Sequence, residues 1–203
     1  MAKRVVVFID EKNYYNGARR AFFRPEDHFT CGNFDPIKLG QLLCSWLPRG
    51  APGGRSLHQV RIYTGRPDAT REPKGYAAHM KQCTVWERGG AVVIARTLRY
   101  PPPWAPSPKP QQKGVDVALA VDLVAMAIDD EYDVGIVAST DSDLRPALEY
   151  VLRKFRDTRQ VEVTSWRSDS HMSRLSVPGA LIWCHRLYRQ HYDAVADLTD
   201  YTR

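Results

Sequence analysis

The chain has 203 residues, of which 43% are hydrophobic and 26% charged, and its formal net charge is +6. This balance is typical of a globular protein with one hydrophobic core and added loops. No apolar run approaches the roughly 20 residues that cross a bilayer, and the run in "MAKRVVVFID" is too short for a secretory signal. We therefore expect a cytoplasmic protein with no membrane partner, whose positive charge favours polyanions.

Five short runs rich in Val and Ile predict the strands. Such runs are typical of strands that are buried on both faces of a parallel sheet. They are "RVVVFI" (4–9), "QVRIYTG" (59–65), "AVVIARTL" (91–98), "DVGIVA" (133–138) and "QVEVTSW" (160–166).

Helical patterns lie between these runs. One begins at Asp35, a good N-cap, with Pro36 at the first helical position. Others are "KGYAAHMKQCTVWERGG", "VDVALAVDLVAMAIDD", "LRPALEYVLRKF" and a C-terminal helix at about 178–198. The alternation predicts an α/β protein, a three-layer α/β/α sandwich with a mainly parallel sheet of about five strands, as a single domain over residues 1–203.

One segment of low complexity interrupts the alternation. "RYPPPWAPSPKPQQKG" (99–114) is rich in proline, which blocks helices and central strands, so we expect an exposed loop there. The four cysteines show no CxxC spacing, which favours reduced thiols over a zinc site. His79 and Cys83 share a helix face, but two ligands without partners do not hold zinc.

Four acids from three separate stretches point to one edge of the predicted sheet. Asp10 ends the first strand, Asp141 and Asp143 follow the fourth in "STDSDL", and Asp116 begins the helix before it. Ligands of parallel α/β sheets gather beyond the carboxyl ends of the strands. Crowded carboxylates repel one another, and Mg²⁺ or Mn²⁺, which prefer oxygen ligands, would compensate the repulsion. The alternative is that each aspartate caps a helix or forms a solvated turn.

Two further polar residues are candidates for the same site. Asn13 lies three residues after Asp10 and could hold an acid or a water with its amide, unless it is only a helix N-terminal residue. Asp122 lies about 240° around the helix from Asp116, so the two residues do not lie on the same face of the helix. We expect Asp122 to orient a metal ligand or a basic side chain, or to be a buried structural residue.

These segments resemble the NYN domain family, a branch of the PIN-like nucleases. "FIDEKNYYNGARRAF", "KGVDVALAVDLVAMA" and "VASTDSDLRPALEYV" are similar to the three acidic motifs of that family and occur in the same order. The resemblance implies a PIN-like fold and a metal-dependent ribonuclease site with Asp10, Asp116, Asp141 and Asp143 at the acidic positions. Glu11 and Thr140 depart from the family pattern, which often has glycine at these positions, and both add a side chain beside the site.

The hypothesis from the sequence is hydrolysis of single-stranded RNA with Mg²⁺ or Mn²⁺ held by the four acids, and Asn13 and Asp122 assisting. The residues expected to contact the RNA backbone are Lys113, Arg19, Arg20 and Arg99. The residues expected to stack on its bases are Tyr14, Phe22, Phe23, Tyr100 and Trp104. A homodimer is one option for the assembly. The main alternative is an RNA-binding or scaffold protein with a vestigial metal site. A phosphatase with an aspartyl nucleophile is disfavoured, because Lys12 stands where its second aspartate would be.

Overall fold

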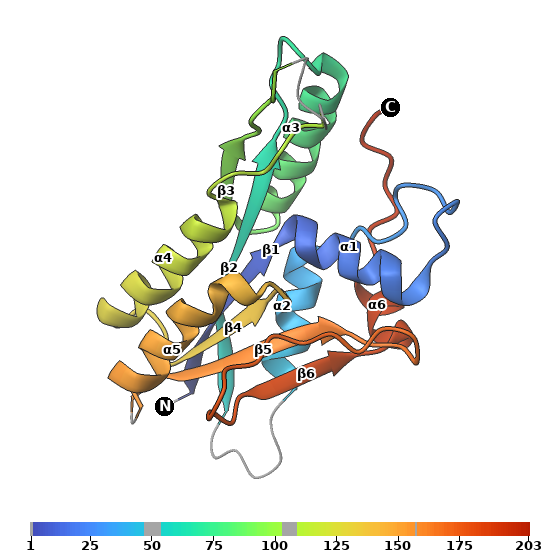
Figure 1. The fold of residues 1–203 in the computed structure, drawn as a ribbon. Helices are drawn as coiled ribbons and strands as arrows, with labels where there is room; N and C mark the ends of the chain where they lie inside the picture. The colour runs from blue at the N-terminus through green and yellow to red at the C-terminus, as the bar shows by residue number, and fades with distance from the viewer. Residues whose placement is uncertain (1, 47–53, 103–108, 157) are drawn as a thin grey trace.

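Six parallel strands form one sheet in the order β3-β2-β1-β4-β5-β6 (Figure 1). The computed structural model describes residues 2–46, 54–102, 109–156 and 158–203. The strands are β1 (Lys3–Asp10), β2 (Arg55–Arg66), β3 (Val92–Thr97), β4 (Val134–Ala138), β5 (Gln160–Trp166) and β6 (Trp183–Leu187). The helices are α1 (Glu11–Phe22), α2 (Pro36–Ser45), α3 (Pro73–Arg88), α4 (Val115–Ile128), α5 (Arg145–Lys154), α6 (Arg189–Val195) and the short 3₁₀ helix η1 (Ser142–Leu144).

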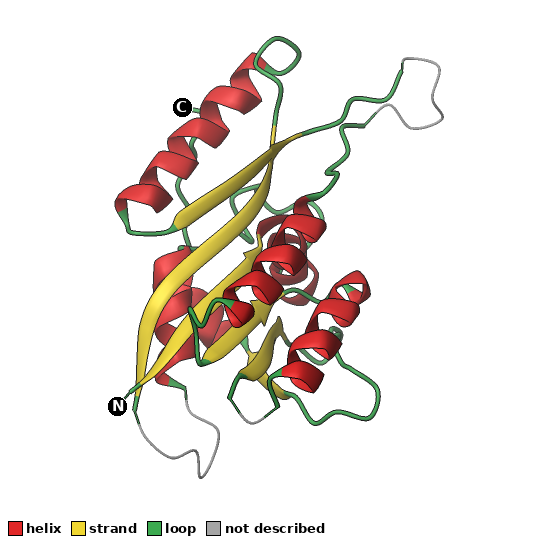
Figure 2. Ribbon diagram, turned by 90° about the vertical axis from the view of Figure 1, so that its left-hand side faces the viewer, coloured by secondary structure: helices red, strands yellow, loops and turns green. Residues whose placement is uncertain are grey.

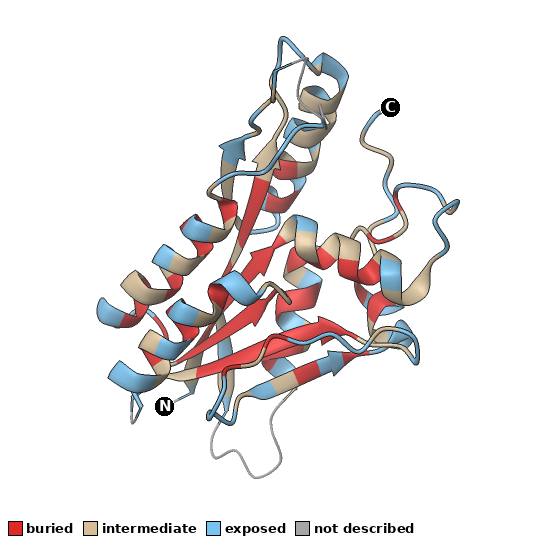
Figure 3. Ribbon diagram, viewed as in Figure 1, coloured by how far each residue is buried: buried red, intermediate tan, exposed pale blue. Residues whose placement is uncertain are grey.

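Helices cover both faces of the sheet, which confirms the predicted three-layer α/β/α class (Figure 2). Val5, Val7 and Ile9 of β1 join the core beneath α1, α2, α3 and α6. Val6 and Phe8 alternate with them and join the core beneath α4 and α5. Burial on both sides explains why the central strands are continuous Val/Ile runs, and the buried residues gather along those strands (Figure 3).

The C-terminal part of the chain corrects the prediction of one helix at about 178–198. Trp183–Leu187 instead forms a sixth strand, paired in parallel with β5, and α6 covers only Arg189–Val195. His185 and Leu187 are buried while Arg186 between them is exposed, which is the two-residue alternation of a strand. None of the helices in the described ranges has the length and apolar character that a bilayer crossing needs.

A buried aromatic contact fixes α1 against β5. The Tyr14 hydroxyl lies 2.9 Å from Thr164 Oγ1, and the Trp166 indole N–H donates to the Tyr14 carbonyl at 3.0 Å. The rings of Tyr14 and Trp166 pack with their centroids 4.8 Å apart. Because α1 follows β1 directly, this contact also fixes the residues at the carboxyl end of β1.

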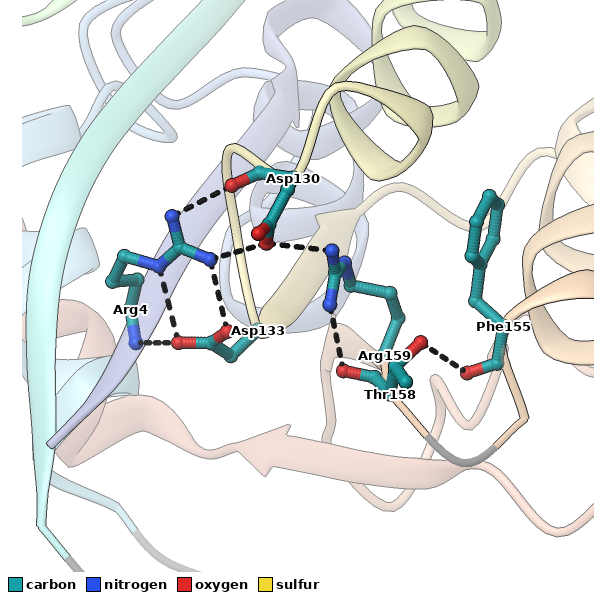
Figure 4. Close-up of polar contacts among 6 residues, drawn as sticks. All are labelled: Arg4, Asp130, Asp133, Phe155, Thr158 and Arg159. Atoms are coloured by element: carbon teal, nitrogen blue, oxygen red, sulfur yellow. Dashed lines mark hydrogen bonds and ion pairs between the residues drawn. The ribbon is translucent and has the colours of Figure 1, made fainter. Parts of the chain in front are cut away.

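An arginine network ties together the opposite, amino edge of the sheet (Figure 4). The Arg4 guanidinium donates to Asp130 at 2.6 Å and to Asp133 at 3.1 Å, and Arg159 donates to the same Asp130 oxygen at 2.6 Å. The hydrogen bonds from Arg4 hold the pKa of Asp133 below its usual range. The network joins the starts of β1 and β4 to the loop before β5, far along the strands from the predicted acid site.

A second ionic group is buried within the α1–α2 face of the sheet. Glu162 of β5 accepts two hydrogen bonds from the Arg55 guanidinium, one of them at 3.0 Å, and a third from His185 Nε2 at 2.7 Å. The three side chains are at most 3% exposed. Although burial opposes the charge, the hydrogen bonds from His185 and Arg55 hold the pKa of Glu162 below its usual range.

We expect Glu162→Gln to destabilise the protein strongly. The substitution keeps the shape but leaves the Arg55 charge buried without a carboxylate, which costs about 3–5 kcal/mol in the free energy of unfolding. Urea denaturation measures this change. Glu149→Gln, at an exposed position of α5, is the matched control and should lie within about 0.5 kcal/mol of wild type. Equal stability of the two variants would contradict the role of the buried group.

Candidate functional site

The carboxyl ends of β1 and β4 lie side by side and bring two acidic segments together. The strands pair in parallel with Ile9 opposite Ala138, so Asp10 lies next to the segment that begins at Ser139. Asp10 is only 6% exposed and caps α1 by accepting a hydrogen bond from the Asn13 N–H at 3.2 Å. A short polar residue at this N-cap position is the local reason why α1 begins there.

Hydrogen bonds lock the loop after β4 onto the first turn of α1. The Ser139 hydroxyl donates to Asp10 Oδ2 at 3.3 Å and accepts from the Asp141 N–H at 3.1 Å. Asn13 Oδ1 accepts from both the backbone N–H and the hydroxyl of Thr140, at 3.0 and 3.1 Å. Asn13 therefore positions the loop that carries Asp141, and Thr140 adds a contact to it that glycine would lack.

Burial makes the Asp10 charge costly in this setting. Loss of water, together with the negative charges of Glu11 and Asp141, raises the pKa of Asp10 to about 6, against the opposing hydrogen bonds from Asn13 and Ser139. Burial likewise raises the pKa of Glu11. A cation at this position would favour the ionised form of Asp10, because an opposite charge nearby lowers a carboxyl pKa.

The other two predicted acids continue the same edge. Asp141 caps η1 by accepting from the Asp143 N–H at 3.0 Å. Asp143 and Asp116 both line one groove of about 520 Å³ between α4 and α5. Asp116 lies in the first turn of α4, which follows Gly114 at a positive φ of 77°. No described residue donates a hydrogen bond to the carboxylate of Asp116 or Asp143, so both remain available to a ligand.

The acids are therefore connected as neighbours in the order Asp10, Asp141, Asp143 and Asp116, but they do not close into a cage. In the described part of the chain, no three His, Cys, Asp or Glu side chains come close enough together to hold a metal ion. Mg²⁺ is usually held by one or two carboxylates and several waters, so Asp10 and Asp141 fit a hydrated ion of this kind. The donors are hard oxygen atoms, which suit Mg²⁺ and Mn²⁺.

Asp122 occupies a different environment from the four acids. Its carboxylate accepts from the Arg61 guanidinium at 2.6 Å and from the Tyr63 hydroxyl at 2.8 Å, which ties α4 to β2. Contact with a basic side chain, one of the expectations for Asp122, is therefore present, and that side chain is Arg61. No contact joins Asp122 to the other four aspartates among the described residues.

The residues predicted to contact RNA differ in their exposure. Arg20, Arg99 and Lys113 are exposed, whereas Arg19 donates to carbonyl oxygens of the loop after α1, including His28 and Cys31 at 2.8 and 2.9 Å. The expectation that Tyr14 stacks on a base is wrong, because Tyr14 is 2% exposed and packs on Trp166. Trp104, another of the stacking candidates, lies outside the described residues.

Sequence reasoning missed a second cleft beside Asp10. It has a volume of about 520 Å³, and its lining includes Glu11, Phe29, Thr64 and His79. Glu11 carried a signal, because it directly follows Asp10 in place of the usual family glycine. Thr64 and His79 carried none. The pairing of β1 with β2, which sets Asp10 opposite Tyr63, brings Thr64 beside Glu11, and His79 of α3 lies 3.4 Å from Thr64.

A comparison with models of protein families tests the resemblance to the NYN domain family that the acidic motifs indicated. The NYN domain model matches residues 4–177, which is more than half of the chain. The chain belongs to the NYN domain family. The NYN domain carries a PIN-like nuclease fold, which agrees with the parallel sheet and with acids at its carboxyl edge.

The NYN chain also resembles a solved structure. A crystal structure of a protein of unknown function from Vibrio parahaemolyticus superposes with a TM-score of 0.51 and 19% identity, covering 80% of this chain and 81% of that one. At this identity the similarity shows the fold alone. No curated protein matches the chain.

We expect Asp10→Asn to stabilise the metal-free protein near neutral pH. Folding raises the Asp10 pKa from 3.8 to about 6, so the ionised carboxyl disfavours the folded state above that pH. The variant should gain up to about 3 kcal/mol in the free energy of unfolding at about pH 7.5, and the gain should vanish below about pH 4.

Urea denaturation in EDTA at the two pH values measures the effect of Asp10→Asn. Asp129→Asn, at an exposed position after α4, is the control and should change stability little at either pH. An Asp10→Asn protein that is less stable than wild type at both pH values would show that burial does not oppose this charge.

Proposed function

We propose that this NYN protein is a metal-dependent ribonuclease that hydrolyses phosphodiester bonds of RNA with Mg²⁺ or Mn²⁺. The observation that carries the proposal is the buried Asp10, joined through the Ser139 hydroxyl to the segment of Asp141 at the carboxyl edge of the sheet. Asp143 and Asp116 extend this acidic edge along the groove between α4 and α5. Membership of the NYN family supports nuclease chemistry for this arrangement.

Each residue of the site has a distinct part in the proposal. Asp10 and Asp141 would hold the ion, and Asp143 and Asp116 would face the RNA from the groove between α4 and α5. A bound ion of this type polarises a phosphodiester and lowers the pKa of a bound water. Asn13 and Ser139 position the acids, because their hydrogen bonds join the first turn of α1 to the loop that carries Asp141.

Exposed cations support a polyanionic substrate. Lys113 lies one residue before the positive-φ Gly114 that opens α4. Arg99, whose backbone pairs with Gln111, is exposed, as is Arg20 in the last turn of α1. Neutralising phosphates with such residues gives affinity that falls with salt. We propose single-stranded RNA, because its unpaired bases remain accessible to the edge of the sheet.

A second candidate function is RNA binding without cleavage. The observation that favours it is the open arrangement of the acids, since no three metal-binding side chains converge in the described ranges. In that case the site would be vestigial, and the acidic edge would only limit where the strand lies. Binding and cleavage must therefore be measured separately.

We expect wild-type protein to cleave a labelled single-stranded RNA when Mn²⁺ is present and not in EDTA. Asp10→Asn and Asp141→Asn should each reduce the cleavage rate by at least about 100-fold, because each removes a carboxylate that holds the ion. Both variants should still bind the RNA in a filter assay.

Asp129→Asn is the control in the cleavage assay, because it removes an exposed acid outside the site. Its rate should equal that of wild type. Binding of RNA by all four proteins without cleavage by any would contradict the nuclease and support the binding function. Equal cleavage by wild type and both site variants would point to a contaminating nuclease.

A further inference from the structure

The cleft next to Asp10 has walls from distant parts of the chain. Its lining comes from the start of α1, the end of β2, one face of α3, the segment around residue 110 and the C-terminal segment near residue 201. Its volume of about 520 Å³ lies within the range of small-molecule sites. Glu11 lines this cleft and directly follows Asp10, so an occupant would lie beside the acid site.

A polar chain of contacts forms one wall of the cleft. Thr64, which is 2% exposed, donates its hydroxyl to Glu11 Oε2 at 3.2 Å, and its Oγ1 lies 3.4 Å from His79 Nε2. With its one hydroxyl proton given to Glu11, Thr64 can accept a hydrogen bond from His79 Nε2. Burial and the Arg66 charge lower the pKa of His79 to about 4, so its ring is neutral at pH 7.

Glu11 has unused capacity to accept hydrogen bonds. Burial raises the pKa of Glu11, while the Lys12 charge and the Thr64 hydrogen bond oppose that shift. In its ionised form the carboxylate has about four acceptor sites on two oxygens. Among the described residues, Thr64 is the one donor to Glu11, and it uses a single site on Oε2. A ligand that presents two adjacent donors would fill the remaining capacity.

The rim of the cleft offers an aromatic surface and positive charge. Phe29 is 48% exposed although it is large and apolar, and the Tyr15 hydroxyl holds its segment by donating to the Phe29 carbonyl at 2.8 Å. Exposed aromatic rings stack on unpaired bases. Lys12 and Lys109 line the same cleft and are exposed, so they can contact phosphates.

We propose that this cleft binds a guanine base of the RNA strand, with the Glu11 carboxylate accepting from N1–H and the N2 amino group. The proposal rests on the proposed function for the identity of the strand. Phe29 stacks on the base, and Lys12 and Lys109 contact the flanking phosphates. Glu11 thereby determines specificity, and because it adjoins Asp10, the guanine lies beside the bond that is cleaved.

Guanine is the base whose hydrogen-bonding edge matches a carboxylate. Its Watson–Crick edge presents two neighbouring donors, N1–H and N2–H₂, to the two carboxylate oxygens. Adenine and cytosine present one amino donor next to an unprotonated ring nitrogen, and uracil presents one N–H between two carbonyl oxygens. In each of these a lone pair would face the negative charge, which costs affinity.

Nucleotide binding to metal-free protein tests the proposal without any cleavage. We would titrate GMP, AMP, CMP and UMP to roughly 10 mM into the full chain in EDTA, following amide shifts by NMR. GMP should bind at least about 10-fold more tightly than the other three, since a bidentate contact discriminates by that amount. The shifts should centre on Glu11, Thr64 and His79.

Three variants separate the contributions. Glu11→Gln keeps the side-chain shape but replaces one acceptor oxygen with a donor, so GMP affinity should fall about 10-fold and the preference should disappear. Phe29→Ala should weaken all four nucleotides alike, by at least about 5-fold. Glu149→Gln, an exposed glutamate of α5, is the matched control and should bind GMP as wild type does.

Asp141→Asn separates this proposal from the nuclease. It should keep the GMP preference even though it loses cleavage, so a failed cleavage assay leaves the guanine result intact. Equal binding of the four nucleotides, binding of none of them, or a GMP preference that survives Glu11→Gln would each overturn the guanine site.

Discussion

The arrangement of the site depends on hydrogen bonds that join two segments more than a hundred residues apart in the sequence. The Ser139 hydroxyl bridges Asp10 and the backbone of Asp141, while the Asn13 amide holds Thr140. Without these bonds the loop after β4 would have no fixed position against α1. They place two carboxyl groups close enough for their charges to interact, in a setting where burial already disfavours the charge of Asp10. The electrostatic cost is local, and a cation would offset it.

The rest of the fold maintains this edge. Parallel pairing of β1 with β4 sets the register that brings Ser139 beside Asp10. The buried Glu162, Arg55 and His185 group lies deep in the α1–α2 face, and the Arg4 network fastens the amino edge. Both are held by internal partners, whereas the carboxylates of Asp116 and Asp143 have no donor among the described residues. The contrast separates the acids that stabilise the fold from those available to a ligand.

Much of this organisation is readable from the sequence, because local patterns determine it. Continuous Val/Ile runs predicted five strands, and Asp35 with Pro36 predicted the start of α2, where both residues have their expected places. The sixth strand was missed, since "WCHRL" is short and its alternation merges with a helical pattern. The cleft could not be foreseen, because it depends on the pairing of β1 with β2 and on the position of α3, which together bring Thr64 and His79 next to Glu11. The prediction that Tyr14 stacks on a base was wrong for a related reason. The sequence shows an aromatic residue but not whether its side chain points into the core or to the surface.

The central claim is that Asp10 and Asp141 lie together and bind a divalent cation between their carboxylates. The most direct measurement is anomalous diffraction from crystals of the protein soaked in Mn²⁺. The account predicts a manganese peak within coordination distance of carboxylate oxygens from both aspartates. A soaked crystal that binds manganese elsewhere, or shows no peak between these two residues, would contradict it.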